Sequence, residues 1–267
     1  MNDSSSAFVP LSDGRYSATP LTRGPWDPNH QHAGPPIALV LGAIERVAAT
    51  QQMTHIARLT ANLFRPVPIA ELSVELDVDY AGRNSVHISA RLHGEGKEVA
   101  RFTALAQREI NQPVTAGLPG HPLPRAPRLP EDSPTARFPF HHHHVGYFDL
   151  VETRVAAGRF FNGPCAVWIR LNHPIVAGEV PSAYQRVAVA ADSGNGVSAV
   201  LDPRRYLFVN FDLTINLLRC PRGAWVCLEA RTLLGDEGSG LAESVLYDTD
   251  GMIGRATQSL FVRERET

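Results

Sequence analysis

The feature that most constrains this chain is a short segment that occurs twice. The stretch LTANLFRP begins at Leu59 and the stretch LTINLLRC begins at Leu213, 154 residues later, and five of their eight positions are identical. Arg101 and Arg255 are separated by the same interval. Chance similarity between two strands would not keep its register over so long a segment. A repeat of this length predicts two copies of one structural unit rather than the short stacked repeats of a solenoid.

Each copy has the pattern of a long helix followed by strands. Residues 35–50 carry apolar side chains at helical spacing behind two prolines, which suit the start of a helix. Residues 71–80 alternate strictly between apolar and polar side chains, as a half-buried strand does. For the first copy we predict a helix at 35–50 and strands at 55–65, 71–80, 85–93 and 97–108. For the second we predict a helix at 182–200 and strands at 206–219, 224–234, 240–248 and 252–263. Further strand-like segments precede the helices, at 15–21 in the first copy and at 147–155 and 165–171 in the second.

A proline-rich segment separates the two copies. Residues 111–134 hold seven prolines and show almost no periodicity, so they predict an extended linker. We therefore divide the chain into an N-terminal unit at 1–112, a linker at 113–138 and a C-terminal unit at 139–267.

Composition excludes several classes of protein. The apolar content of 43% and charged content of 19% are typical of a soluble globular chain, and the net charge of −2 gives no basic footprint for nucleic acid. We expect no signal peptide and no membrane span, because no basic segment precedes an apolar core and no apolar run approaches about 20 residues. Three cysteines do not make a disulfide framework. These features predict a cytoplasmic protein with free thiols.

Four segments, taken in order, resemble the acyl-CoA thioesterase II branch of the hotdog superfamily. They are HAGPPIALVLGAIERV (32–47), FRPVP (64–68), DSGNG (192–196) and ATQSLFV (256–262). The resemblance implies an α+β double hotdog, that is, two tandem hotdog units, each a curved antiparallel sheet wrapped around a long helix. It also implies hydrolysis of acyl-CoA to free acid and CoA by an activated water, without a cofactor. A homo-oligomer, a dimer of double hotdogs, is the expected assembly.

The repeat itself singles out two polar residues. Thr232 and Gln258 lie on strand faces where the first copy has Val78 and Ala104. A buried polar group without a partner costs a few kcal/mol, so each substitution needs a reason. A backbone partner, or exposure at a strand end, would be a structural reason. The family resemblance offers a catalytic one, because Thr or Ser and Gln on these strands help to orient the attacking water.

The same resemblance assigns the third member of the catalytic set to Asp212. Its counterpart in the first copy is Arg58, so the chain would have one equipped site. A carboxylate can accept a proton from water, while a hydroxyl and an amide fix the orientation of that water. Strict alternation, however, puts Asp212 on the face opposite Leu213 and Ile215. The prediction therefore needs a twist or a bulge to bring Asp212 round.

The start of the first helix is the candidate binding site for the thioester oxygen. Backbone N–H groups of Ala33 and Gly34, next to His32, would face the oxygen with the helix dipole behind them. Alternatively, Gly34 only forms a turn before a helix that begins with proline, and has no role in binding. In the second helix, DSGNG lowers helix propensity. Asp192 could line the site, or the glycines could only permit close packing, which we favour slightly.

Two other interpretations compete with the thioesterase. Asp27, Asn29 and His32 have the D-x-N-x-x-H spacing of hotdog enoyl-CoA hydratases, although His30 replaces the usual proline and GPP follows the thioesterase pattern. A non-catalytic scaffold that binds acyl thioesters is the second. The run His141–His144 suggests a metal, but adjacent histidines cannot all point one way on a strand, and no Cys or acidic partner has ligand spacing. We expect no metal site.

Overall fold

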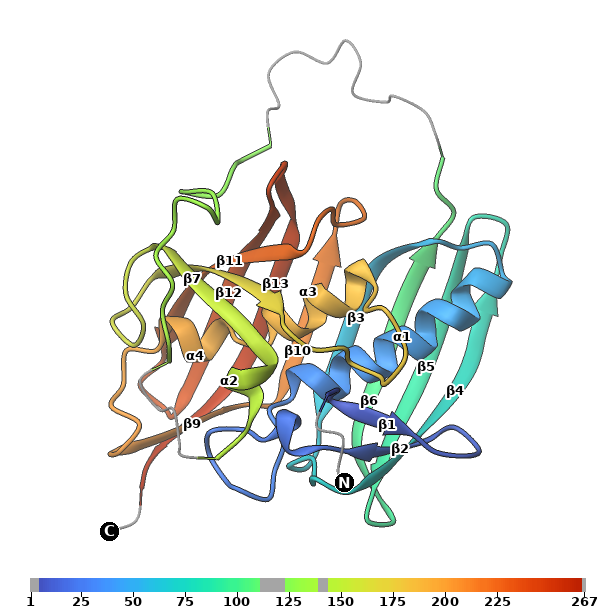
Figure 1. Ribbon diagram of the computed structural model, residues 1–267, viewed down its shortest axis with the longest axis horizontal. Helices are drawn as coiled ribbons and strands as arrows, with labels where there is room; N and C mark the ends of the chain where they lie inside the picture. The colour runs from blue at the N-terminus through green and yellow to red at the C-terminus, as the bar shows by residue number, and fades with distance from the viewer. Residues whose placement is uncertain (1–4, 111–122, 139–143, 266–267) are drawn as a thin grey trace.

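The structure is a computed structural model that describes residues 5–110, 123–138 and 144–265. Within these residues, thirteen strands form one continuous sheet with antiparallel neighbours, and this sheet curves around the helices (Figure 1). The strand order is β1-β2-β4-β5-β6-β3-β10-β13-β12-β11-β8-β7, with β9 also paired to β13.

The elements follow the order of the two copies. The first half contains β1 (Phe8–Pro10), β2 (Arg15–Ala18), a short 3-10 turn (Pro20–Thr22), α1 (Gly34–Thr50), β3 (His55–Leu63), β4 (Glu71–Ala81), β5 (Ser85–Gly94) and β6 (Lys97–Gln107). The second half contains α2 (Tyr147–Leu150), β7 (Val151–Ala157), β8 (Cys165–Leu171), α3 (Ala183–Ala191), α4 (Gly194–Ser198), β9 (Tyr206–Asn210), β10 (Asp212–Leu217), β11 (Trp225–Leu234), β12 (Ser239–Asp248) and β13 (Gly251–Glu264).

The repeated segment forms the seam between the two halves. Strands β3 and β10 pair with each other, so that Thr60 lies directly opposite Thr214 and their hydroxyl oxygens are 3.2 Å apart. These two threonines are also counterparts in the repeat. Equivalent residues can face each other only where a twofold axis passes between them, so the two halves are related by a pseudo-twofold axis at this pair.

The two long helices pack against each other inside the sheet. From Gly34 to Ile44 every residue of α1 is buried, which suits a helix enclosed by the sheet on one side and α3 on the other (Figure 1). Gln185 of α3 donates from Nε2 to the carbonyl of Ala38 at 3.1 Å. Gly42 lies under the same amide, where a Cβ would come within 2.5 Å of it. A side chain at residue 42 would therefore displace the Gln185 amide from this contact between the helices.

The second half differs from the sequence prediction in three places. The helix expected at 182–200 breaks after Ala191 and resumes as α4 at Gly194, because Ser and Gly hold the helix weakly there. The strand expected at 206–219 is split at Phe211 into β9 and β10. The strand expected at 147–155 begins with the one-turn helix α2.

Part of the predicted linker lies along the second half. The indole N–H of Trp168 donates to the carbonyl of Arg128 at 2.7 Å, and the N–H of Ala136 donates to the carbonyl of Thr153 at 3.0 Å. The segment 123–138 is thus bonded to the edge of the C-terminal sheet.

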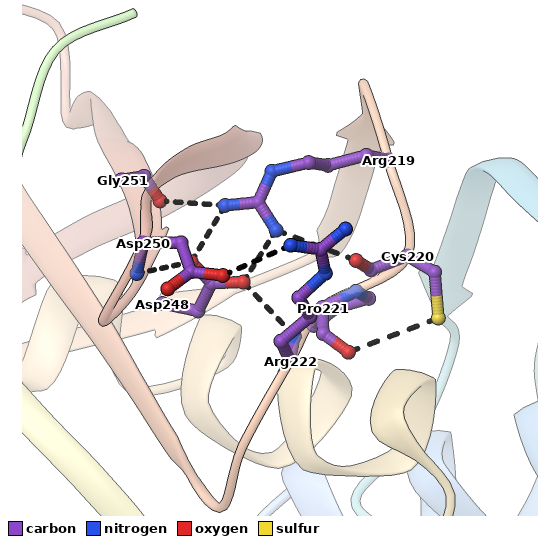
Figure 2. A network of polar contacts seen from close by, with 7 residues as sticks. All are labelled: Arg219, Cys220, Pro221, Arg222, Asp248, Asp250 and Gly251. Atoms are coloured by element: carbon purple, nitrogen blue, oxygen red, sulfur yellow. Dashed lines mark hydrogen bonds and ion pairs between the residues drawn. The ribbon is translucent and has the colours of Figure 1, made fainter.

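An ion pair ties two connections at one end of the C-terminal sheet (Figure 2). Arg219, after β10, donates from Nη2 to Oδ1 of the fully buried Asp248 at 2.6 Å, and from Nη1 to Oδ2. The backbone N–H groups of Arg222 and Asp250 donate to the same carboxylate, each at 2.9 Å. This network holds the short β10–β11 connection against the β12–β13 turn, and so fixes the strands that carry the site described below.

Candidate active site

Thr232 and Gln258 lie in one row across the inner face of the C-terminal sheet. Thr232 of β11 is in register with Ala242 of β12, which is in register with Gln258 of β13. Neighbouring strands are about 4.8 Å apart, so the two backbones are separated by about 10 Å. Ala242 between them has a small side chain, and the short helix α4 packs against these same strands. The structure therefore brings the two polar residues to one wall beneath α4.

Gln258 is buried and fully bonded to the junction between α3 and α4. Its Oε1 accepts from the N–H of Asn195 at 3.0 Å, and its Nε2 donates to the carbonyl oxygen and to Oδ1 of Asp192, both at 3.2 Å. A Cβ on Gly194 would lie 3.0 Å from Gln258 Oε1. Both explanations of DSGNG hold, because the glycine permits close packing and Asp192 faces the site.

The carboxylate of Asp192 is the centre of this cluster. Its side chain is only 3% exposed. Its Oδ1 accepts from Asn210 Nδ2 at 2.9 Å as well as from Gln258, and its Oδ2 lies 2.9 Å from His32 Nδ1. An ionised carboxylate needs hydrogen-bond donors when it is removed from water. Asn210 and Gln258 provide two at Oδ1, and these stabilise the charge in this buried site.

His32 connects this carboxylate to the start of α1. Its ring stacks on Tyr147, with centroids 3.7 Å apart and planes 4° apart. The Tyr147 hydroxyl donates to the Val189 carbonyl at 3.0 Å and lies 2.8 Å from Ser193 Oγ. Burial raises the pKa of Tyr147 above its ordinary value, so the phenol stays neutral. The imidazole is thereby fixed in one orientation.

The backbone at the start of α1 completes the cluster. The N–H of Gly34 donates to His32 Nδ1 at 3.1 Å. A Cβ on residue 34 would lie 3.1 Å from the Val189 carbonyl, so glycine allows α1 to begin against α3. Ala33 is the N-cap residue of α1 and makes no side-chain cap. Of the three residues predicted for oxyanion binding, His32 contacts Asp192 directly, and Gly34 is joined to it through His32.

Asp212 is not brought to this cluster. Asn210 is paired with Leu260, and Thr214 is paired with Thr257. Between these two pairs lie residues 211–213 on one side but only 258–259 on β13, and this extra residue is a β-bulge. The bulge turns Asn210 inward and leaves Asp212 on the opposite face from the buried Leu213. Its Oδ1 accepts from the backbone N–H of Ser259 at 2.6 Å. The geometry gives no support to the predicted role of Asp212 as the base.

Thr232 faces a small pocket beside α4. Its Oγ1 lies 2.8 Å from Ser198 Oγ, and Ser198 Oγ donates to the carbonyl of Gly194 at 2.9 Å. Thr232 therefore donates its proton to Ser198 and keeps its lone pairs for another donor. The pocket is lined by Asn195, Ala199, Val200, Leu201, Phe208, Thr232, Leu234 and Leu260. Its lining is mostly apolar, but the pocket is closed in this structure and has no room for even a water molecule.

The pair proposed for a hydratase is not formed. Asp27 accepts from the N–H of Asn29 at 2.7 Å and its Oδ2 lies 3.4 Å from His30 Nδ1, while His32 contacts Asp192. Asp27 is also 44% exposed. The dyad of Asp27 and His32 that the hydratase interpretation requires is therefore absent from this fold.

The equivalent positions in the first half do not make a second cluster of this kind. Ala104 is buried, Val78 is 45% exposed near the end of β4, and the counterpart of Asp192 at the repeat interval is Ala38, which has no carboxylate. Within residues 5–110, 123–138 and 144–265, no three His, Cys, Asp or Glu side chains gather as metal ligands do. His141–His143 lie outside the described residues, and none of the described helices has the length and apolar character needed to cross a bilayer.

Sequence reasoning left Asp192 undecided and missed Asn210, Tyr147 and Asn195. The signal for Asp192 was present, since an acidic residue followed by two glycines stands where the first copy has an uninterrupted helix. Asn210 could not be found in the same way, because its inward orientation depends on the bulge.

Family models match both halves of the chain. Residues 22–107 match the model of the acyl-CoA thioesterase N-terminal domain, and residues 128–262 match that of the acyl-CoA thioesterase C-terminal domain. A search of curated proteins finds no significant match in sequence.

Solved structures share the fold over nearly the whole chain. A candidate thioesterase II from Thermobifida fusca YX superposes with a TM-score of 0.73 at 16% identity, covering 99% of this chain and 97% of that one. The acyl-CoA thioesterase II TesB2 from Mycobacterium marinum gives 0.70 at 14% identity, over 97% and 96%. A hot dog fold protein from Alicyclobacillus acidocaldarius gives 0.70 at 16%, over 99% and 98%. The predicted double hotdog is confirmed, and the chain belongs to the acyl-CoA thioesterase family.

Proposed function

We propose that this protein hydrolyses acyl-CoA thioesters to a free acid and CoA, and that Asp192 rather than Asp212 activates the attacking water. One observation carries the proposal. The buried Asp192 carboxylate receives donors from Gln258 and Asn210 and contacts His32, which belongs to the opposite half of the chain. A carboxylate held this way is a general base that need not reorganise when it takes a proton.

Each neighbouring group has a part in the reaction. Gln258 and Asn210 hold Oδ1 of Asp192, which leaves Oδ2 as the oxygen that receives the proton of water. Thr232, whose own proton goes to Ser198, accepts a hydrogen bond from the water or from the substrate. The N–H of Ala33 at the start of α1 stabilises the developing oxyanion, while the N–H of Gly34 stays bonded to His32 Nδ1.

The acyl chain enters beside Thr232, where the apolar side chains that close the small pocket must move apart to admit it. CoA, which is too large to be enclosed there, extends on the solvent side of His32. The division into units at 1–112 and 139–267, the dimer of double hotdogs and the cytoplasmic location stay predictions. Light scattering on the purified protein tests the dimer.

A panel of acyl-CoA substrates from acetyl to palmitoyl, assayed by release of free thiol, tests the function. We expect thiol release at a rate that depends on chain length. Loss of the absorbance of an unsaturated acyl-CoA without thiol release would identify a hydratase instead. Binding without either reaction would identify a scaffold.

A further inference from the structure

Nδ1 of His32 makes two contacts that cannot both be hydrogen bonds at the same time. The N–H of Gly34 points at it from 3.1 Å, and Asp192 Oδ2 lies 2.9 Å from it. A backbone N–H can only donate, so Nδ1 accepts from Gly34 through its lone pair. A lone pair facing an ionised carboxylate oxygen at 2.9 Å is repulsive. The second contact becomes favourable only when a proton lies between Asp192 and His32.

That proton is available during hydrolysis. When Asp192 takes a proton from the attacking water, the protonated oxygen can donate to Nδ1, and the repulsive contact becomes a hydrogen bond. The contact between Asp192 and His32 is thus more favourable after Asp192 has taken the proton than before. An interaction that becomes stronger along the reaction in this way lowers the activation barrier. The other ring nitrogen, Nε2, then carries the only proton of the neutral imidazole.

We infer that His32 is a catalytic residue, the general acid that protonates the departing thiolate, and that Asp192 resupplies its proton. The inference rests on the proposed function and extends it. His32 is suited to this position because its side chain is 15% exposed, against 3% for Asp192. Within the described residues Nε2 has no hydrogen-bond partner. A leaving group that stays on the solvent side therefore reaches His32 more readily than Asp192.

The step balances without another reactant. Water adds to the thioester carbon and gives one proton to Asp192 Oδ2. The carbon–sulfur bond then breaks, its electron pair leaves with sulfur, and the Nε2 proton of His32 passes to that sulfur. In the same step the proton on Asp192 moves to Nδ1, so the imidazole stays neutral and the carboxylate is ionised again. His32 is then protonated at Nδ1, and the starting form returns when Nε2 takes a proton from solvent and Nδ1 gives one up. The products are the acid and the free thiol, and loss of the acid's proton to solvent completes the turnover.

The test compares two leaving groups on the same acyl group. One substrate is the acyl-CoA, whose alkyl thiolate is basic, and the other is the ester of an acidic aromatic thiol, whose thiolate leaves without a proton. For His32→Asn, whose amide oxygen can keep an acceptor near the place of Nδ1 and which has no group at Nε2, we expect about a hundredfold loss of kcat/KM with acyl-CoA. With the aromatic thioester we expect a much smaller loss.

Tyr147→Phe is the matched control, because it keeps the ring under His32 and should treat both substrates alike. Equal losses for His32→Asn with both leaving groups would overturn the inference and leave His32 a positioning residue. If the variant does not fold, the wild-type enzyme still decides the question with a series of thiols of graded acidity. A weak dependence of kcat/KM on thiol acidity supports proton donation, and a steep one overturns it. Failure of the wild type to hydrolyse either ester would instead remove the proposed function.

Discussion

Asp192→Asn should abolish most of the hydrolysis while leaving the fold intact. In the variant, the amide oxygen can still accept from Asn210 and Gln258, at the place where Oδ1 lies now. Its NH2 group can donate to Nδ1 of His32, which already accepts from Gly34. Every buried contact of residue 192 is therefore retained, so we expect the free energy of unfolding to change by no more than about 1 kcal/mol.

The catalytic cost is much larger, because an amide cannot accept the proton of water. Loss of a general base costs about 10²–10⁴ in rate, which corresponds to about 3–5 kcal/mol in the activation barrier. Asp212→Asn is the matched control, since its amide oxygen can still accept from the N–H of Ser259 on the other face of the sheet. We expect near wild-type turnover from it.

The assay is the release of free thiol from a saturating acyl-CoA, with thermal unfolding of each variant measured in parallel. Full activity in a folded Asp192→Asn protein would refute the assignment of Asp192 as the general base. A loss of activity of about a hundredfold or more in Asp212→Asn would refute it as well.

The remaining predictions concern the neighbours of the base and the stability of the sheet. Thr232→Val and Gln258→Ala copy the apolar character of the first half, and both should lose activity; unchanged activity per folded molecule would make them structural. Arg58→Ala should leave turnover largely intact, and calorimetric titration with a non-hydrolysable acyl-CoA analogue should give one site per chain rather than two. Arg219→Ala should lower the free energy of unfolding by about 2–4 kcal/mol, measured by denaturant titration, because it leaves the Asp248 carboxylate buried with only backbone donors. Burial alone would raise the pKa of Asp248, but hydrogen bonds from Arg219 and Arg222 hold it below its ordinary value. This stabilisation is present above the unfolded pKa of about 4 and is lost as the pH falls through the lower folded pKa; an acid unfolding curve that does not differ between wild type and Arg219→Ala would contradict it.

The repeat predicted the architecture because its helices and strands are recognised from the spacing of apolar residues within each segment. Helical spacing in 35–50 and alternation in the strands of the first half survive into the structure nearly residue for residue. The repeat did not predict that Thr60 and Thr214 would meet across the seam between the two halves.

The site was harder to predict because two irregular features build it. Phe208 and Leu213 are both buried, although they are an odd number of residues apart. Even-numbered residues therefore point inward before the bulge, and odd-numbered residues point inward after it. Apolar residues at Leu207, Val209 and Phe211 hide that change from a pattern search. The helix break at Asp192 depends in turn on Gln258 and His32, which come from distant parts of the chain. Gln258 and Thr232 were found because the comparison of the two copies needs no knowledge of either irregularity.

Incubation of the wild-type protein with an acyl-CoA in water enriched in oxygen-18 tests the central claim most directly. Mass spectrometry of the products measures the acid, its label and the CoA released. Activation of water by Asp192 predicts equimolar CoA and free acid, with one solvent oxygen in each acid molecule. Intact acyl-CoA after prolonged incubation, or an acid without the label, would contradict the account.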